Sequence, residues 1–156
     1  MKYKIPPKHV SLLKKLYKLF KDENIDWILA GSTALVMRGI DIEVHDLDIQ
    51  VKKKDLKKIT KLLDKYTTKE LKYVQTDELN IRSYWGKYLI DGVELDIASE
   101  IAHKLNGKWK KINTKTATTY EFEGMKIKLL PLRVEYEGYL AMSRTEKANK
   151  ILKALR

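Results

Sequence analysis

The sequence predicts a single domain of the α/β (α+β) class, in which helices pack on a small mixed β-sheet. Helical patterns stand near both ends of the chain, and strand patterns fill the middle. The length of 156 residues suits one domain over 1–156, and no linker, repeat or low-complexity tract divides it. Helices before and after a mixed sheet are typical of this class.

Hydrophobic periodicity predicts the elements of the first half. Gly31-Ser32 breaks an apolar run, and Gly39 supplies a helix stop. The expected elements are a helix over 10–20, a strand over 26–30, a helix over 32–38, a strand over 46–51 and an amphipathic helix over 54–66.

Turn residues mark the elements of the second half. Asp91-Gly92 is a hairpin signal, Gly124 marks a second hairpin, and Pro131 can open a helix. The expected elements are strands over 71–76, 81–90, 93–98, 116–123 and 125–130, then helices over 131–142 and 145–155.

Composition limits the chemistry of any site. The chain has no cysteine, which excludes disulfides, thiolate metal ligands and a cysteine nucleophile. Its three histidines are scattered and show no zinc spacing. A metal ion would therefore be held mainly by oxygen, which favours Mg²⁺ or Mn²⁺.

The net charge of +11 favours a polyanionic partner such as RNA, or a phosphate-rich substrate. Only five of the 32 basic residues are arginines, and a lysine-rich composition is also typical of proteins of thermophiles. Both interpretations stay open. No run approaches the roughly 20 apolar residues of a membrane helix, and the first residues lack the apolar core of a signal peptide, so we expect a cytoplasmic protein without a membrane partner.

Gly31-Ser32 is the first candidate for a functional motif. Glycine permits a tight turn after the strand, and Ser32 can cap the helix that follows. The free N–H groups of a helix N-terminus can bind phosphate. Taken alone, the pair also fits an ordinary strand-to-helix turn with Ser32 as a plain N-cap.

Asp46-Leu47-Asp48 is the second candidate. Residues two apart in a strand project from the same face, so both carboxylates point one way and Leu47 points into the core. Their mutual repulsion would be relieved by a divalent cation. A lone Asp-x-Asp also fits a solvated strand edge.

Asp96 is the third candidate, and with it the other two motifs can form a functional site. It shares one strand face with Glu94, between Leu95 and Ile97 on the apolar face. If this strand neighbours the strand over 46–51, three carboxylates converge. Such a cluster suits two metal ions, one on the NTP phosphates and one lowering the pKa of the attacking hydroxyl, with Asp96 positioning or deprotonating the acceptor. A structural salt bridge of Asp96 is the alternative.

These motifs, spread over about residues 25–98, resemble the signature of the polymerase-β-like nucleotidyltransferase superfamily, with its minimal and antibiotic-type members. The resemblance implies the nucleotidyltransferase fold and a metal-bound NTP substrate, for which we expect ATP. Gly31 and Ser32 would hold its β- and γ-phosphates. Asp46 and Asp48 would ligate both metals, and Asp96 would ligate the catalytic one.

The C-terminal part, over 115–156, resembles the end of the same domain. There Arg144-Thr145-Glu146-Lys147 follows a strand and a helix, but Ser143 and Ala148 stand where the family has glycine and aspartate. Arg144 and Lys147 lie three apart and could share a helix face toward the triphosphate. A solvated helix face fits them as well.

The predicted function is metal-dependent transfer of an NMP from an NTP to a hydroxyl acceptor. The charge favours an RNA end, such as that of tRNA, or a small helical partner protein as the acceptor. A small molecule is also possible as the acceptor. The alternative is a non-catalytic module that keeps the fold and binds nucleic acid or protein, and a two-metal nuclease ranks third. The transferase is preferred because a polyanion-binding module gains nothing from three carboxylates.

Overall fold

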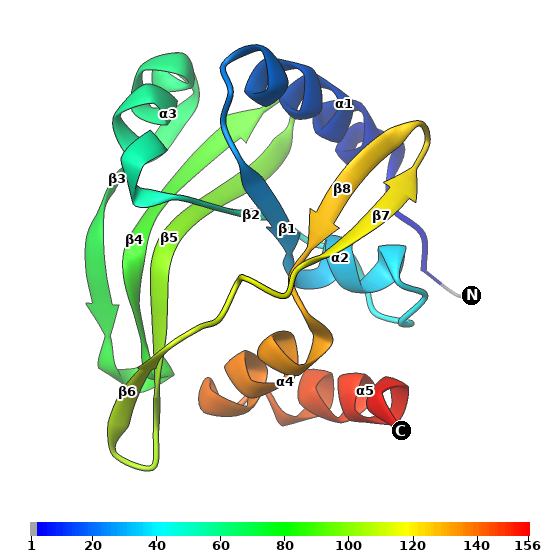
Figure 1. Cartoon of the computed structure of the whole chain (residues 1–156), viewed down its shortest axis with the longest axis vertical. Helices are drawn as coiled ribbons and strands as arrows, with labels where there is room; N and C mark the ends of the chain where they lie inside the picture. The colour runs from blue at the N-terminus through cyan, green and yellow to red at the C-terminus, as the bar shows by residue number, and fades with distance from the viewer. Residues whose placement is uncertain (1–2) are drawn as a thin grey trace.

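The computed structural model describes residues 3–156 and contains an eight-stranded mixed sheet flanked by helices (Figure 1). The strands run in the order β3-β4-β5-β2-β1-β8-β7, and β6 pairs with β5 outside this path. The predicted fold class is confirmed. The strands are β1 (Trp27–Ala30), β2 (Leu47–Val51), β3 (Thr67–Thr76), β4 (Ile81–Ile90), β5 (Val93–Leu105), β6 (Lys108–Lys111), β7 (Thr118–Phe122) and β8 (Met125–Leu129).

Five α-helices accompany the sheet, with short 3₁₀ turns at Lys53–Asp55, Asp64–Tyr66 and Asp77–Leu79. The α-helices are α1 (Pro7–Asp22), α2 (Gly31–Met37), α3 (Leu56–Leu62), α4 (Leu132–Ala141) and α5 (Thr145–Leu155). None of the helices among residues 3–156 is long and apolar enough to cross a membrane.

The main core lies between α1, α3 and the apolar face of the central strands. Leu47 and Ile49 of β2 are buried there beside Leu95 and Ile97 of β5, as their alternation predicts. The apolar stripe of α1 covers them with four buried residues, Leu12, Leu13, Leu16 and Phe20. Because these strands bury their odd-numbered residues, Asp48 and Asp96 are left on the other face.

A second apolar cluster joins the C-terminal helices to the rest of the fold. Leu35 and Val36 of α2 pack with Tyr139 of α4 and with Ala148 and Ile151 of α5. Figure 1 shows α4 and α5 lying side by side beneath α2. This packing holds the end of the chain next to the Gly31 turn.

Three elements differ from the sequence prediction. The strand expected over 93–98 continues to Leu105 and pairs with β6, which was not predicted. A β-bulge at Glu100, with φ of +57°, breaks the alternation on which the prediction depended. The strand expected over 71–76 begins earlier, at Thr67, as β3. The sequence did not reveal this start because β3 is a largely exposed edge strand without an apolar alternation. The helix expected over 54–66 is divided into α3 and two 3₁₀ turns.

Candidate functional site

The Gly31 turn is shaped by the close approach of Asp48. Gly31 has φ of +69°, and a Cβ added to it would lie 2.1 Å from Oδ2 of Asp48. No side chain fits in that space, and the left-handed conformation itself disfavours other residues. The prediction that glycine is needed for this turn is thus supported by two separate features.

Ser32 has a role different from the one predicted. The N-cap of α2 is Ala30, in an extended conformation, and no side chain caps this helix. The Ser32 hydroxyl instead accepts a hydrogen bond from the backbone N–H of His45, at 3.1 Å. Ser32 is buried in the first turn, so its oxygen is used to fasten the loop that leads into β2 rather than the helix end. The expectation of a Ser32 N-cap is wrong.

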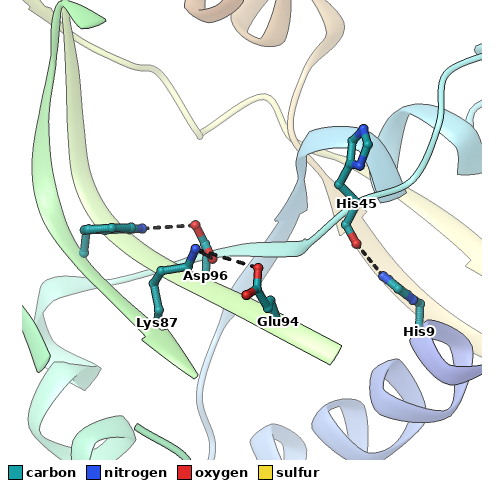
Figure 2. A network of polar contacts seen from close by, with 6 residues as sticks. His9, His45, Lys87, Glu94 and Asp96 are labelled. Carbon is teal, nitrogen blue, oxygen red and sulfur yellow. Dashed lines mark hydrogen bonds and ion pairs between the residues drawn. The ribbon is translucent and has the colours of Figure 1, made fainter. Parts of the chain in front are cut away.

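The loop before β2 is held from several sides, which fixes the approach to Asp46. The Thr33 hydroxyl donates to the carbonyl of Asp46 at 3.4 Å. Figure 2 shows the ring of His9 on α1 meeting the carbonyl of His45, with 2.7 Å between Nε2 and the oxygen. His45 is therefore held through its backbone, and its exposed ring takes no part in these contacts.

Asp48 and Asp96 come together as Cα partners on the adjacent parallel strands β2 and β5. The condition on which the convergence of the acids depended, that these two strands are neighbours, is met. Asp46 lies one residue before β2 and acts on Asp48 through its charge. Among residues 3–156, no three histidine, aspartate or glutamate side chains gather closely enough to hold a metal ion. The register thus places Asp48 and Asp96 next to each other on adjacent strands, and Asp46 lies just before this pairing begins.

The environment of Asp96 includes residues from β4 (Figure 2). Nε1 of Trp85 donates a hydrogen bond to Oδ2 of Asp96 at 3.1 Å. Nζ of Lys87 lies 3.9 Å from Oδ1 of Asp96 and 3.8 Å from Glu94. Oδ1 of Asp96 is buried and makes no hydrogen bond within the described chain. One oxygen of Asp96 is therefore fixed by the indole, and the other faces the Lys87 ammonium without accepting a hydrogen bond.

The electrostatics favour a cation between these carboxylates. Burial, together with the charges of Asp96 and Asp46, raises the pKa of Asp48 to about 7, against the opposing effect of Lys147 and Arg144. Burial also raises the pKa of Asp96, although the Trp85 hydrogen bond and Lys87 lower it. An all-oxygen donor set under such repulsion fits Mg²⁺ or Mn²⁺.

Glu135 of α4 is a site residue that the sequence did not reveal. Its buried carboxylate accepts a hydrogen bond from the backbone N–H of Gly31 at 3.0 Å. Burial, together with the charge of Asp48, raises its pKa to about 8. In an amphipathic helix an isolated glutamate reads as a surface residue. Its spacing from the buried Gly138 and Tyr139, three and four residues on, was the available signal.

Arg144 and Lys147 are brought toward the acids. Arg144 is the residue before α5 and Lys147 lies in its first turn. Burial, together with the charge of the nearby Arg144, lowers the pKa of Lys147. The charges of both lower the pKa of Asp48, and Nζ of Lys147 lies 5.5 Å from the centre of the Tyr139 ring. Arg144 is exposed and Lys147 is partly buried, so their role at the triphosphate stays a prediction.

A cleft of about 310 Å³ opens beside these groups, between the sheet and α4. Asp48, Asp96, Glu135 and Arg144 line its polar end. Away from them its walls are mainly apolar, with side chains from β3, β4, β5 and α4. The carboxylates thus stand at one end of a cavity suited to a small organic group.

Comparison with known proteins now identifies the family. The sequence profile of aminoglycoside-2''-adenylyltransferases matches residues 12–155. The chain belongs to this family. It is thereby a member of the nucleotidyltransferase superfamily, and the prediction of a nucleotidyltransferase is confirmed. No protein with a curated description matches the sequence.

Solved structures support the family assignment. A Thermotoga maritima protein described as a nucleotidyltransferase shares 32% identity, with a TM-score of 0.80, over 99% of this chain and 96% of that one. ANT(2'')-Ia in complex with adenylyl-2''-tobramycin has the same fold at 12% identity and a TM-score of 0.64, over 94% and 89% of the two chains. The lincosamide antibiotic adenylyltransferase LnuA, at 14% identity, gives a TM-score of 0.53 over 88% and 96%.

Proposed function

We propose that this nucleotidyltransferase transfers the NMP of a metal-bound NTP, with ATP preferred, to a hydroxyl group of an acceptor. The observation that carries the proposal is the register of Asp48 with Asp96 on adjacent strands, directly beside the Gly31 turn. Two carboxylates at the open end of a cleft, with a basic pair nearby, form an arrangement suited to phosphoryl chemistry. Membership of an adenylyltransferase family supports ATP as the donor.

In this proposal Asp48 and Asp96 would hold the divalent cations, and Asp46 would add its negative charge from the residue before β2. When bound, the metal neutralises phosphate charge and lowers the pKa of the acceptor hydroxyl. Asp96, with one oxygen fixed by Trp85 and the other without a hydrogen bond, would position that hydroxyl or take its proton. Arg144 and Lys147 supply positive charge to the triphosphate, and the Gly31-Ser32 turn lies against its β- and γ-phosphates.

The acceptor has two supported classes. The family name, together with ANT(2'')-Ia and LnuA as structural neighbours, supports a hydroxyl of a small molecule. The net charge of +11 supports an acceptor with phosphates, such as an RNA 3′ end. A non-catalytic module is disfavoured because it gives no reason for the Asp48–Asp96 pair.

Changing Asp96 to Asn tests the proposed chemistry. Asparagine keeps an oxygen for the Trp85 hydrogen bond but removes the charge, so we expect transfer to fall about a hundredfold or more, within the range of a lost general base. Labelled ATP with Mg²⁺ is offered to a panel of acceptors, comprising tobramycin, lincomycin, total tRNA and short RNA, and incorporation is measured. Glu94→Gln, on an exposed neighbour of the same face, is the matched control and should retain activity.

A binding measurement separates loss of chemistry from loss of fold. A non-hydrolysable ATP analogue with Mn²⁺ should raise the melting temperature of the wild type by mass action. Asp96→Asn should fold with a similar melting temperature when the ligand is omitted. Equal labelling by Asp96→Asn and wild type would overturn the proposed role of this carboxylate.

A further inference from the structure

A second, larger cleft of about 580 Å³ adjoins the candidate active site. It opens where the pairing of β2 with β5 ends, since Gln50 and Ala98 are the last partners and the two strands separate beyond them. Figure 1 shows the segment that joins β6 to β7 running across the sheet at this place, and residues 112–115 of that segment line the cleft. Gln50, Ile101 and Ile112 line both clefts, so the two lie next to each other.

The second cleft carries an excess of positive charge. Its walls contain five lysines and two carboxylates. The lysines are Lys52, Lys53, Lys111, Lys115 and Lys128, and the carboxylates are Asp26 and Glu100. This excess is a local property of the cleft, beyond the general basicity of the chain.

The carboxylates do not neutralise all of these lysines. Asp26 is shared by Lys52, at 3.4 Å, and Lys128, at 3.0 Å, while Glu100 pairs with Lys111. Within the described chain, Lys53 and Lys115 form no ion pair, and Lys53 lies 5.5 Å from the centre of the Tyr84 ring. Two exposed ammonium groups therefore remain free to meet an anionic ligand.

The position of this cleft relative to the carboxylates indicates that it would hold the acceptor rather than the NTP. Along β2, Asp46 precedes Asp48 and Lys52 follows it, so the lysines lie on the side away from Asp46. Arg144 and Lys147 act on the Asp46–Asp48 end. Lys52 is four residues beyond Asp48, about 13 Å at roughly 3.3 Å per strand residue. If the terminal hydroxyl of a nucleic-acid strand reached Asp96, the phosphates that precede this hydroxyl would lie near the lysines.

We propose that the second cleft binds the phosphates of a single-stranded RNA acceptor, whose 3′ end enters the first cleft beside Asp96. This inference rests on the proposed nucleotidyl transfer and names its acceptor class. An aminoglycoside carries several ammonium groups, which the uncompensated lysines repel. A single strand instead offers phosphates to the lysines and unstacked bases to the apolar walls between the two clefts.

The test uses a double variant and a matched control. Lys53→Glu with Lys115→Glu reverses the two unpaired charges of the cleft. Lys57→Glu with Lys61→Glu makes the same change in net charge on the exposed side of α3. Binding of a short fluorescent RNA is followed by anisotropy without NTP or metal, so this readout does not depend on catalysis.

We expect the cleft variant to bind RNA about tenfold or more weakly than wild type, while the α3 variant stays within about threefold. The slope of log Kd against log salt should fall by about 1.4 for two lost phosphate contacts on a single strand. In the transfer assay, KM for RNA should rise with little change in kcat, and KM for ATP should stay the same.

Several results would overturn the inference while leaving nucleotidyl transfer intact. These are equal RNA binding by the cleft and α3 variants, transfer to tobramycin or lincomycin but never to RNA, or a loss confined to KM for ATP. Absence of transfer to every acceptor, together with no stabilisation by the ATP analogue and Mn²⁺, would instead refute the proposed function itself.

Discussion

At the scale of single residues, the Gly31 turn stands between two buried carboxyl groups. Oδ2 of Asp48 touches the space where a side chain at Gly31 would be, and Glu135 accepts the Gly31 N–H. The pKa of Asp48 is raised to about 7 and that of Glu135 to about 8, chiefly by burial. Near neutral pH the turn is therefore flanked by groups that hold protons an exposed acid would release.

The raised pKa of Glu135 predicts a pH-dependent stability that Glu135→Gln should remove. The pKa in the folded state, about 8, lies above the ordinary value of 4.5, so the contribution is complete below 4.5 and is lost as the pH rises toward 8. Glutamine cannot ionise, but its oxygen can still accept the Gly31 N–H. Between about pH 5 and pH 8.5, wild type should lose more free energy of unfolding than Glu135→Gln does.

Urea denaturation across this pH range measures the difference. Glu137→Gln, two residues away on α4 and outside the contact with Gly31, is the control and should follow the wild-type pH dependence. Parallel curves for wild type and Glu135→Gln would show that Glu135 is not a buried acid with a raised pKa.

At the scale of elements, the bulge of β5 builds the far wall of the active-site cleft. Before it, Asp96 and Ala98 face the cleft, and after the extra residue at Glu100 the cleft-facing positions become Ile101 and His103. The register confirms the shift, because Tyr84 pairs with Ser99 while Arg82 pairs with Ala102. One residue in a left-handed conformation thus turns odd-numbered side chains toward the cleft.

Replacing Glu100 tests whether the bulge needs its left-handed residue. Asparagine adopts positive φ readily, whereas a β-branched residue does not, so Glu100→Val should cost about 1–2 kcal/mol more free energy of unfolding than Glu100→Asn. Both variants lose the ion pair with Lys111, so the effect of that loss cancels when the two variants are compared. Urea denaturation measures both, and equal losses would show that the bulge conformation is not under strain.

At the scale of the whole molecule, two apolar clusters hold the site together from opposite sides. The main cluster aligns β2 with β5, and with them Asp48 with Asp96. The second cluster fastens α4 and α5 to α2, which brings Glu135 and Lys147 to the Gly31 turn. The groups proposed for the metal and those proposed for the triphosphate are therefore positioned by different cores.

Truncating Ile151 should weaken the second cluster. This side chain is fully buried on α5, so Ile151→Ala should lower the free energy of unfolding by about 2–4 kcal/mol. Leu140 on α4 is 46% exposed, and Leu140→Ala should change the free energy of unfolding by no more than about 1 kcal/mol. Urea denaturation gives both values. Similar effects of the two variants would mean that α5 is not held by the packing seen here.

Local pattern alone was enough for many elements and for part of the candidate site. The bounds expected for 81–90 and 145–155 agree with β4 and α5, since alternation and helical spacing are strong in those segments. Asp48 and Asp96 were found because a period of two separates them from the apolar residues around them. Their roles, with those of Asp46, Arg144 and Lys147, stay predictions.

Tertiary structure decided the rest, because contacts between distant segments leave no period in the sequence. Glu135 meets Gly31 across 104 residues of chain, and its helix position alone does not reveal that contact. Trp85 reads as a packing residue until β4 and β5 pair and its indole reaches Asp96. The sequence by itself determined the fold class and the acids of the central strands, whereas only the packed structure determined which side chains surround them.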